Sequence, residues 1–281
     1  MKNTRLLLIT ILLLGVLSPI FGLNLKTATF NIRMATSADG INEWKYRVPI
    51  VEKTLQSENL DVIGFQEVLH TQLLDLQKIL PNYAYYGVGR EDFKEKGEYA
   101  AIFYKKDQFK LIEGNTFVLA ADTNAIGVLG WDAVCTRIVT WVLLEDIKTQ
   151  QRFYFFNTHF DHIGKIAQKN SAELLVQKAL QKSALYPVII TGDFNSNPTS
   201  EAYSTITKSF TDSKTIAQKV KGDSYTYQGF KKVSIDQYCL IDFIFVSSNI
   251  YIKKYETSCP EENGVLLSDH NIVIVEIDIK F

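Results

Sequence analysis

Short apolar runs alternate with amphipathic segments along most of the chain. The runs "LKTATFNIR" (residues 25–33) and "DVIGFQEV" (residues 61–68) are rich in apolar and β-branched residues, which is typical of β-strands. Between them, Val48, Val51 and Leu55 recur at helical spacing, and Pro49 fits the first turn of a helix. The pattern predicts a β-α-β unit at the start of the folded part.

The middle of the chain contains several strand-like runs without a helix between them. Gly, Asn or charged residues separate the runs, and this arrangement favours antiparallel pairing. The runs are "AYYGVGR" (84–90), "EYAAIFYKK" (98–106), "FKLIEGNTFVLA" (109–120), "AVCTRIVTWVLLED" (133–146) and "QRFYFFNTHF" (151–160).

The last part alternates again between helix and strand. Residues 164–182 place Ala172, Leu175, Val176 and Ala179 on one helical face, and strand-like runs follow. Strands as apolar as these need cover on both faces, so we expect one compact domain, residues 23–281, with packed sheets inside and helices outside. The later strand-like runs are "YPVIITGDFN" (186–195), "IDFIFV" (241–246), "IYIKKYE" (250–256) and "NIVIVEIDI" (271–279).

The first 22 residues have the layout of a signal peptide. Lys2 and Arg5 precede an uncharged apolar stretch, which is interrupted at Ser18 and Pro19 and ends at the small residue Gly22. An uncleaved membrane anchor is the alternative, because the stretch is at the short end of spanning length. We expect cleavage, export to the periplasm, cell surface or medium, no stable membrane insertion afterwards, and a monomer.

Charge and cysteine content narrow the function. Removing residues 1–22 takes away two of the 30 Lys+Arg and none of the 31 Asp+Glu, which leaves a net charge of about −3. Sequence-independent binding of long nucleic acid needs a basic surface, so the negative net charge argues against such binding. Net charge does not describe local charge, and a local basic groove is compatible with it. Cys135 and Cys239 are expected to be buried free thiols on strands, with a Cys239–Cys259 disulfide as an alternative.

Polar side chains follow several apolar runs at the point where each strand is expected to end. Glu67 ends "DVIGFQE", and Asp193 and Asn195 follow the buried run "VIIT". Oxygen ligands in such positions suit a hard cation such as Mg²⁺. Structural alternatives exist: a Glu is favoured at a helix N-terminus, and Asp and Asn also stabilise turns.

Two further clusters carry histidine. "NTHFDH" holds two of the chain's four histidines, His159 and His162, and "SDH" places His270 beside Asp269. Asp242 lies near the start of an earlier strand, and a carboxylate that orients a histidine is a common acid/base device.

Taken together and in order, these motifs resemble the endonuclease/exonuclease/phosphatase superfamily, whose fold is DNase I-like. The resemblance extends from about Leu25 to the C-terminus. It implies an α/β (α+β) fold: a four-layered sandwich of two face-to-face mixed β-sheets flanked by helices, with the site at one end of the sheets and Mg²⁺ or Mn²⁺ as cofactor. The motif residues are Asn31 in "TFNIR", Glu67 in "FQE", His159 in "NTHFDH", Asp193 and Asn195 in "GDFN", Asp242 in "IDFIFV", and Asp269 and His270 in "SDH".

The resemblance also implies a role for each motif residue. Glu67 is the implied principal metal ligand, with Asn31 and Asp269 beside it. His159 is placed against the scissile phosphate, and Asp193 and Asn195 orient the attacking water and the phosphate. His270, held by Asp242, stabilises the developing charge or moves a proton. The comparison leaves the identity of the general base open.

Some positions depart from the abasic-site endonuclease branch of the superfamily. Arg33 stands where that branch has an acidic residue, which argues against DNA repair. Arg137 is a potential phosphate contact or an outward-facing strand charge, and Trp131 stacks on a substrate ring or anchors its loop. His162 is grouped with them as a substrate-binding residue. Glu98 either supports the site from behind or merely begins a strand.

We therefore predict an exported Mg²⁺-dependent hydrolase that cleaves a small phosphomonoester or phosphodiester by metal-assisted in-line attack of water. A secreted nuclease acting on DNA or RNA is the alternative, and a sphingomyelinase-like lipid phosphodiesterase and a non-catalytic binding module are less favoured. Specificity in this superfamily depends on the loops around a shared phosphate site, so the sequence does not name the substrate.

Overall fold

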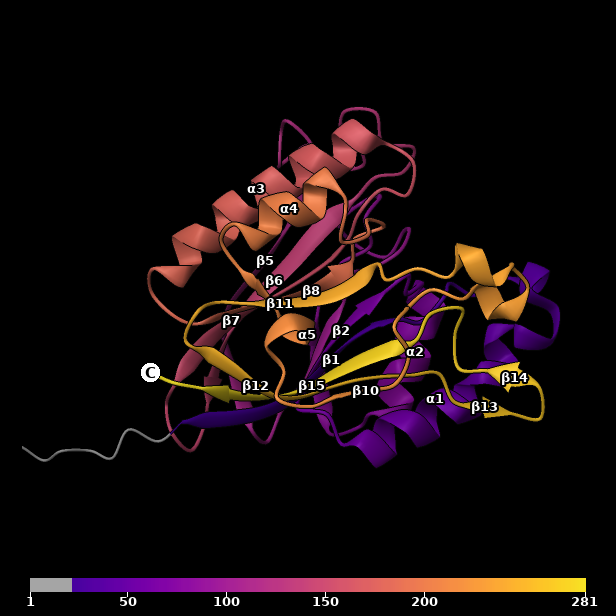
Figure 1. Ribbon diagram of the computed structural model, residues 1–281, viewed down its shortest axis with the longest axis horizontal. Coiled ribbons are helices and arrows are strands. Elements are labelled where there is room, and N and C mark those ends of the chain that lie inside the picture. The colour runs from indigo at the N-terminus through magenta and orange to yellow at the C-terminus, as the bar shows by residue number, and fades with distance from the viewer. Residues whose placement is uncertain (1–21) are drawn as a thin grey trace, which may run out of the picture.

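The computed structural model describes residues 22–281, which form two large β-sheets packed face to face with helices on the outside (Figure 1). The predicted signal peptide lies outside the described residues apart from Gly22. Among the described residues, none of the helices has the length and apolar character needed to cross a membrane.

The first sheet has seven strands, and the chain's first and last strands pair at its centre. β1 runs parallel to β2 and antiparallel to β15. In spatial order the strands are β10 (Val220–Lys221), β12 (Ile250–Ser258), β15 (Ile272–Ile279), β1 (Leu23–Asn31), β2 (Val62–Gln66), β4 (Ile102–Lys105) and β3 (Tyr83–Tyr86).

The second sheet has six strands with a second parallel pair, β7 with β8, at its centre. Its other pairings are antiparallel. In spatial order the strands are β5 (Phe109–Val118), β6 (Ile138–Asp146), β7 (Arg152–His159), β8 (Val188–Asp193), β11 (Asp242–Val246) and β9 (Thr211–Asp212), and a separate hairpin joins β13 (Glu261–Glu262) to β14 (Val265–Leu266).

Helices cover the outer face of each sheet and complete four layers, as the resemblance implied. In Figure 1, α3 and α4 lie above the second sheet, and α1 lies below the first. α1 connects β1 to β2 and α3 connects β7 to β8, so each of these two parallel pairs belongs to a β-α-β unit, unlike the short parallel pair of β10 with β12. The helices are α1 (Trp44–Glu58), α2 (His70–Ile79), α3 (Lys165–Ser183), α4 (Glu201–Thr207) and α5 (Ser213–Ile216), with short 3₁₀ turns at Ser37–Asn42, Gly229–Lys231 and Ile235–Gln237.

Alternation along the strands divides the core into three layers. On β7, Phe155 faces the other sheet, whereas Phe156 packs beneath α3. On β2, Val62 faces inward and Phe65 packs toward α1. A strand that is buried on both faces has apolar residues at successive positions. This explains the uninterrupted apolar runs in the sequence.

Toward one end of the sandwich the space between the sheets becomes polar. Asn157 of "NTHFDH" is fully buried there, and its Nδ2 donates to the carbonyl oxygens of Phe65 (2.8 Å) and Ala101 (3.0 Å) in the opposite sheet. Gln66 Nε2 in turn donates to Asn157 Oδ1 (2.6 Å). Gly64 leaves room for these side chains, because a Cβ at Gly64 would collide with Asn157 and Thr191. These bonds join the two sheets directly beneath the polar strand ends.

Two local predictions were wrong. α1 begins at Trp44, so Pro49 lies inside the helix rather than in its first turn. β6 begins only at Ile138, which leaves Cys135 in a loop and partly exposed, and Cys239 is also partly exposed outside the named strands. All three cysteines are free thiols, so the alternative Cys239–Cys259 disulfide is not formed.

Candidate active site

The carboxyl ends of the parallel pairs β1–β2 and β7–β8 meet at the same end of the sandwich. β1 and β2 deliver Asn31 and Glu67, and β7 and β8 deliver His159 and Asp193. A cavity of about 490 Å³ opens there. Its lining residues are Arg33, Met34, Glu67, Glu98, Cys135, Arg137, His159, His162, Asp193, Asn195, Tyr227, Cys239, Ile241, Asp269 and His270.

Glu67 is held in a strained backbone conformation at the end of β2. Its φ of 62° is in the left-handed region, which a non-glycine residue seldom adopts and which often marks a functional position. Its carboxylate accepts hydrogen bonds from the backbone N–H of Met34 (2.9 Å) and from Asn31 Nδ2 (3.1 Å). The strained turn therefore directs the carboxylate into the cavity.

Asn31 bridges two carboxylates from different sheets. Its Nδ2 donates to Glu67 Oε1 and to Asp193 Oδ2 (2.9 Å), and its Oδ1 accepts the N–H of Arg33 (3.0 Å). In this orientation Asn31 positions the acidic side chains by donating to them. Its assignment as a direct metal ligand stays a prediction.

Arg33 lies between the two carboxylates that the sequence assigned to a metal. Its guanidinium is 3.9 Å from Glu67 Oε2 and 3.8 Å from Asp269 Oδ2, and the buried Asp39 holds it through two bonds of 3.1 Å. Arg33 also has a left-handed φ of 57°. Burial raises the pKa of Asp269, and Arg33 partly opposes this by favouring its ionised form.

His159 and Asn195 form one side of the site. Asn195 Nδ2 lies 3.0 Å from His159 Nε2 and also donates to the carbonyl oxygen of Phe160 (3.0 Å). Burial, and after it the positive charge of Arg137, lower the pKa of His159 to about 3. The imidazole is therefore neutral at physiological pH.

His270 and Asp242 form a buried pair at the base of the cavity. His270 Nδ1 lies 2.9 Å from Asp242 Oδ2, and its Nε2 lies 3.7 Å from Asp193 Oδ2. Burial alone would lower the pKa of His270, but the charges of Asp242 and Asp193 outweigh it and raise the pKa well above the ordinary value. Burial and the Asp242 carboxylate raise the pKa of Asp193. His270 is therefore a proton donor beside an acidic acceptor.

Arg137 faces the cavity with unused donors. It is only 5% exposed, and its Nε and Nη1 have no hydrogen-bond partner. Its Nη2 lies 3.2 Å from His162 Nδ1, and Nη1 lies 3.9 Å from Glu98. A buried guanidinium with unpaired N–H groups is prepared to receive an anion. Its facing into the cavity excludes the alternative of an outward-facing strand charge.

Tyr227 is a site residue that the sequence did not predict. It packs edge-on against His270, with ring centroids 5.1 Å apart, and lines the cavity. Glu98 accepts a bond from Arg90 (2.7 Å) and lies 3.7 Å from His159 Nδ1, which supports the site from behind. Trp131 is 38% exposed in the loop before β6 and is not among the cavity-lining residues. No sequence signal marked Tyr227, because it lies in a long irregular loop.

The donor set fits a divalent cation. Glu67 and Asp269 direct carboxylates into one cavity, and the ligand atoms of the buried Asp193, Asp242 and His270 lie within 4.8 Å of one another. Carboxylate oxygens are the ligands that hard cations prefer. Glu67 and Asp269, the ligands expected from the sequence, would hold such a cation.

Comparison with known proteins agrees with this geometry. The model of the endonuclease/exonuclease/phosphatase family matches residues 28–270. The chain is 40% identical to a Bacteroides vulgatus endonuclease/exonuclease/phosphatase (TM-score 0.88, covering 92% of this chain and 100% of that one). It is 34% identical to a Bacteroides thetaiotaomicron mannosyl-6-phosphatase (TM-score 0.82, covering 90% and 99%). An uncharacterized protein of Acanthamoeba polyphaga mimivirus is 25% identical over 85% of this chain and 94% of its own length.

The family model spans nearly the whole described chain, and the strand ends bring the motif residues of both sheets to one cavity. The chain therefore belongs to the endonuclease/exonuclease/phosphatase family and is an enzyme that hydrolyses phosphoesters.

Proposed function

We propose that the protein is an exported, Mg²⁺-dependent hydrolase of a small phosphoester. The observation that carries the proposal is that Glu67 and Arg137 line the same cavity. Arg137 is a buried arginine, and two of its nitrogens have no hydrogen-bond partner. A cation site beside a free guanidinium suits a phosphoryl group, whose oxygens carry the negative charge.

The chain's own residues account for the remaining steps. Arg137 donates to the nonbridging oxygens of the substrate, and His159 and Asn195 line the other side of the phosphoryl position. Asp193, with its raised pKa, accepts a proton from the attacking water, and the protonated His270 donates to the developing negative charge. When bound at Glu67 and Asp269, Mg²⁺ supplies Lewis-acid polarisation of a phosphoryl oxygen.

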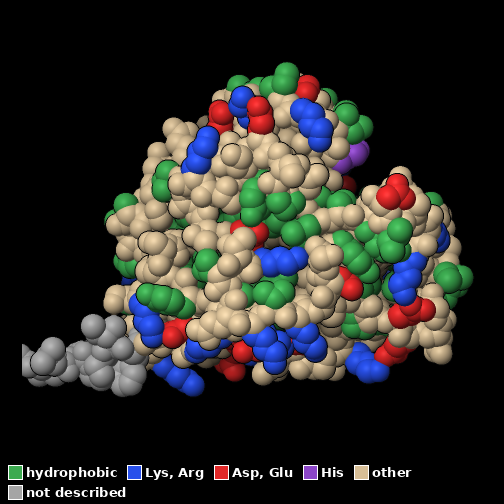
Figure 2. Space-filling view, in the orientation of Figure 1, with side chains coloured by type: hydrophobic (Ala, Val, Ile, Leu, Met, Phe, Trp, Pro, Cys, Tyr) green, Lys and Arg blue, Asp and Glu red, His purple; other side chains and the backbone are tan. Residues whose placement is uncertain are grey.

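A phosphomonoester of a sugar is the favoured substrate. The mannosyl-6-phosphatase of Bacteroides thetaiotaomicron shares 34% of its residues with this chain and aligns with 90% of it. The cavity is small enough for a phosphosugar or a nucleotide. The nuclease alternative lacks such support, since the basic and acidic side chains are interspersed over most of the face in Figure 2 and the net charge after cleavage is about −3.

Hydrolysis of a substrate panel tests the proposal. The mature protein would be assayed with Mg²⁺ and with EDTA on hexose 6-phosphates, nucleotides, a generic phosphodiester, a sphingomyelin-type lipid, RNA and plasmid DNA. We expect turnover of a phosphosugar that disappears in EDTA and in Glu67→Ala. Cleavage of polymers, falling steeply with salt, would establish the nuclease instead, and no turnover by the folded protein would refute the proposal.

Export and a monomeric state belong to the same proposal. Fractionation of cells that express the full chain would locate the protein, and N-terminal sequencing would define its first residue. We expect the mature chain to begin near Leu23 and to elute as a monomer. Recovery of an uncleaved chain in the membrane fraction would favour the anchor.

A further inference from the structure

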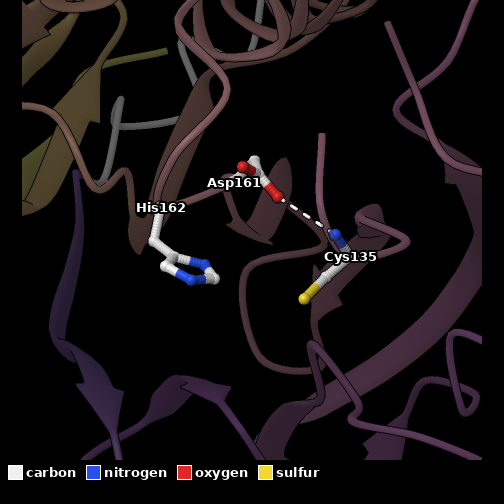
Figure 3. Close-up of side chains that lie close together, drawn as sticks. All are labelled: Cys135, Asp161 and His162. Carbon is white, nitrogen blue, oxygen red and sulfur yellow. Dashed lines mark hydrogen bonds between the residues drawn. The ribbon is translucent and has the colours of Figure 1, made fainter. Parts of the chain in front are cut away.

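Asp161 lies at the centre of a cluster with Cys135 and His162 beside the cavity (Figure 3). The three side chains offer ligand atoms within 4.8 Å of one another, which suggests a metal site at first sight. The carboxylate of Asp161 already accepts four backbone hydrogen bonds, two on each oxygen. They come from Val134 (3.0 Å) and Cys135 (3.2 Å) to Oδ2, and from Ile163 (2.9 Å) and Gly164 (2.7 Å) to Oδ1.

Four hydrogen bonds occupy the acceptor positions of a carboxylate, so Asp161 has none left for a cation. The bonds instead join two loops that wall the cavity: residues 119–137 before β6, and residues 160–164 between β7 and α3. Gln168 of α3 extends the connection, because its Nε2 donates to the carbonyl oxygens of Asp161 (2.7 Å) and Asn195 (3.0 Å).

Asp161 also acts on Arg137 through charge. Its Oδ2 lies 3.8 Å from Arg137 Nε, and both residues are buried, with Asp161 only 1% exposed. At this distance the carboxylate attracts the guanidinium without using up its hydrogen-bond donors. Arg137 Nε and Nη1 therefore stay without a hydrogen bond, and Arg137 lines the cavity.

We propose that Asp161 is the positioning residue for phosphate recognition. It fixes the loops on either side of Arg137 and holds the guanidinium by charge, so that the two free nitrogens are presented to the anion. The inference rests on the proposed function in one respect, namely that the anion is the phosphoryl group of the substrate.

A double-mutant cycle tests the proposal by titration calorimetry of inorganic phosphate with Mg²⁺ present. Asp161→Asn removes the charge and replaces one acceptor oxygen by a donor. We expect phosphate affinity to fall about tenfold in the otherwise native protein. In an Arg137→Gln background, where the guanidinium is absent, the same change should lower the remaining affinity less than about twofold. Asp161→Glu, which keeps the charge, should retain part of the affinity.

Asp132→Asn is the matched control. Asp132 joins the first of these loops to the first turn of α3 by accepting the backbone N–H groups of Ile166 (3.3 Å) and Ala167 (2.6 Å), and it has no hydrogen bond to Arg137. We expect Asp132→Asn to lower Tm and leave phosphate affinity unchanged.

Two outcomes would overturn the proposal. One is an equal loss of phosphate affinity from Asp161→Asn in both Arg137 backgrounds, and the other is an equal loss in Asp132→Asn. If Asp161→Asn fails to fold, the cycle is run with Asp161→Glu under the same criteria. Binding is measured without turnover, so this outcome is distinct from an absence of hydrolysis.

Discussion

Asn195 Nδ2 lies 3.0 Å from His159 Nε2, and this contact defines the tautomer of the histidine. The amide is oriented by its second bond, to the carbonyl oxygen of Phe160, so the atom facing His159 is a donor. His159 Nε2 must then carry the lone pair, and the proton resides on Nδ1, 3.7 Å from Glu98. With a pKa of about 3, His159 enters the reaction as a neutral group of fixed orientation.

Asn195→Asp should abolish most of the activity with little effect on folding. The new carboxylate cannot donate to His159, and it adds negative charge beside Asp193. By analogy with the loss of a single transition-state donor, we expect kcat to fall on the order of 10²-fold. Steady-state kinetics with circular dichroism as the folding control would measure this. A fall smaller than about threefold would show that the contact is dispensable.

His159 should not titrate between pH 5 and 8. Burial and Arg137 lower its pKa to about 3, so the ring stays neutral across that range. Two-dimensional NMR of ¹⁵N-labelled imidazoles would follow the shifts across this pH range. Protonation of His159 near pH 6 would contradict the assigned environment.

Glu67→Gln should weaken metal binding more than the loss of a residue that only supports a metal ligand. Mutation of residues that merely support metal ligands commonly costs 10–100-fold in affinity, so removal of the principal ligand should cost more than about 100-fold. Mn²⁺ binding followed by electron paramagnetic resonance would test this without any substrate. Glu58→Gln, on the surface and paired with Lys26, is the control and should bind Mn²⁺ normally.

Strand-end chemistry is the part of the site that the sequence makes predictable. Glu67 and Asp193 follow apolar runs, and the carboxyl ends of parallel strands gather at one edge. Hydrogen bonds between residues far apart in the sequence were not predictable. Arg47 is fully buried and donates to the carbonyl oxygens of Ile32, Arg33, Asn42 and Leu267. These bonds join distant parts of the chain.

The misplaced features have physical causes in the structure. Cys135 lies within an apolar run that resembles one continuous strand, but the bonds from Val134 and Cys135 to Asp161 hold residues 133–136 in a loop. Pro49 lies in the second turn of α1, although proline is most common in the first turn. The helix start predicted from it was therefore too late.

Gly64→Ala should destabilise the fold strongly. An added Cβ would meet Asn157 and Thr191 where the two sheets are joined by hydrogen bonds. Overpacking of this kind costs roughly 1–3 kcal/mol, and the lost bonds add to it. Urea unfolding would measure the change. Gly264→Ala is the comparison: no atoms lie within 4 Å of its Cβ, so only the strain of a φ of 79° remains and the loss should be smaller.

Asp161→Asn should alter stability at acid pH. Burial would raise the pKa of Asp161, but the four backbone N–H groups outweigh it and lower the pKa. A carboxyl with a lowered folded pKa contributes stability that is complete above its unfolded pKa, about 3.9, and is lost as pH falls through the folded value. Tm measured from pH 7 down to pH 2 should therefore fall less steeply at the acid end in the variant than in the native protein. Parallel curves would contradict this.

The pairing of β15 with β1 at the centre of the first sheet has a consequence for folding during synthesis. β15 also separates β1 from β12, so this sheet cannot close until the last residues of the chain have left the ribosome. Asp269 and His270 immediately precede β15 and arrive equally late. A growing chain is thus kept both open and inactive until its synthesis ends, which is the state that the proposed export would require.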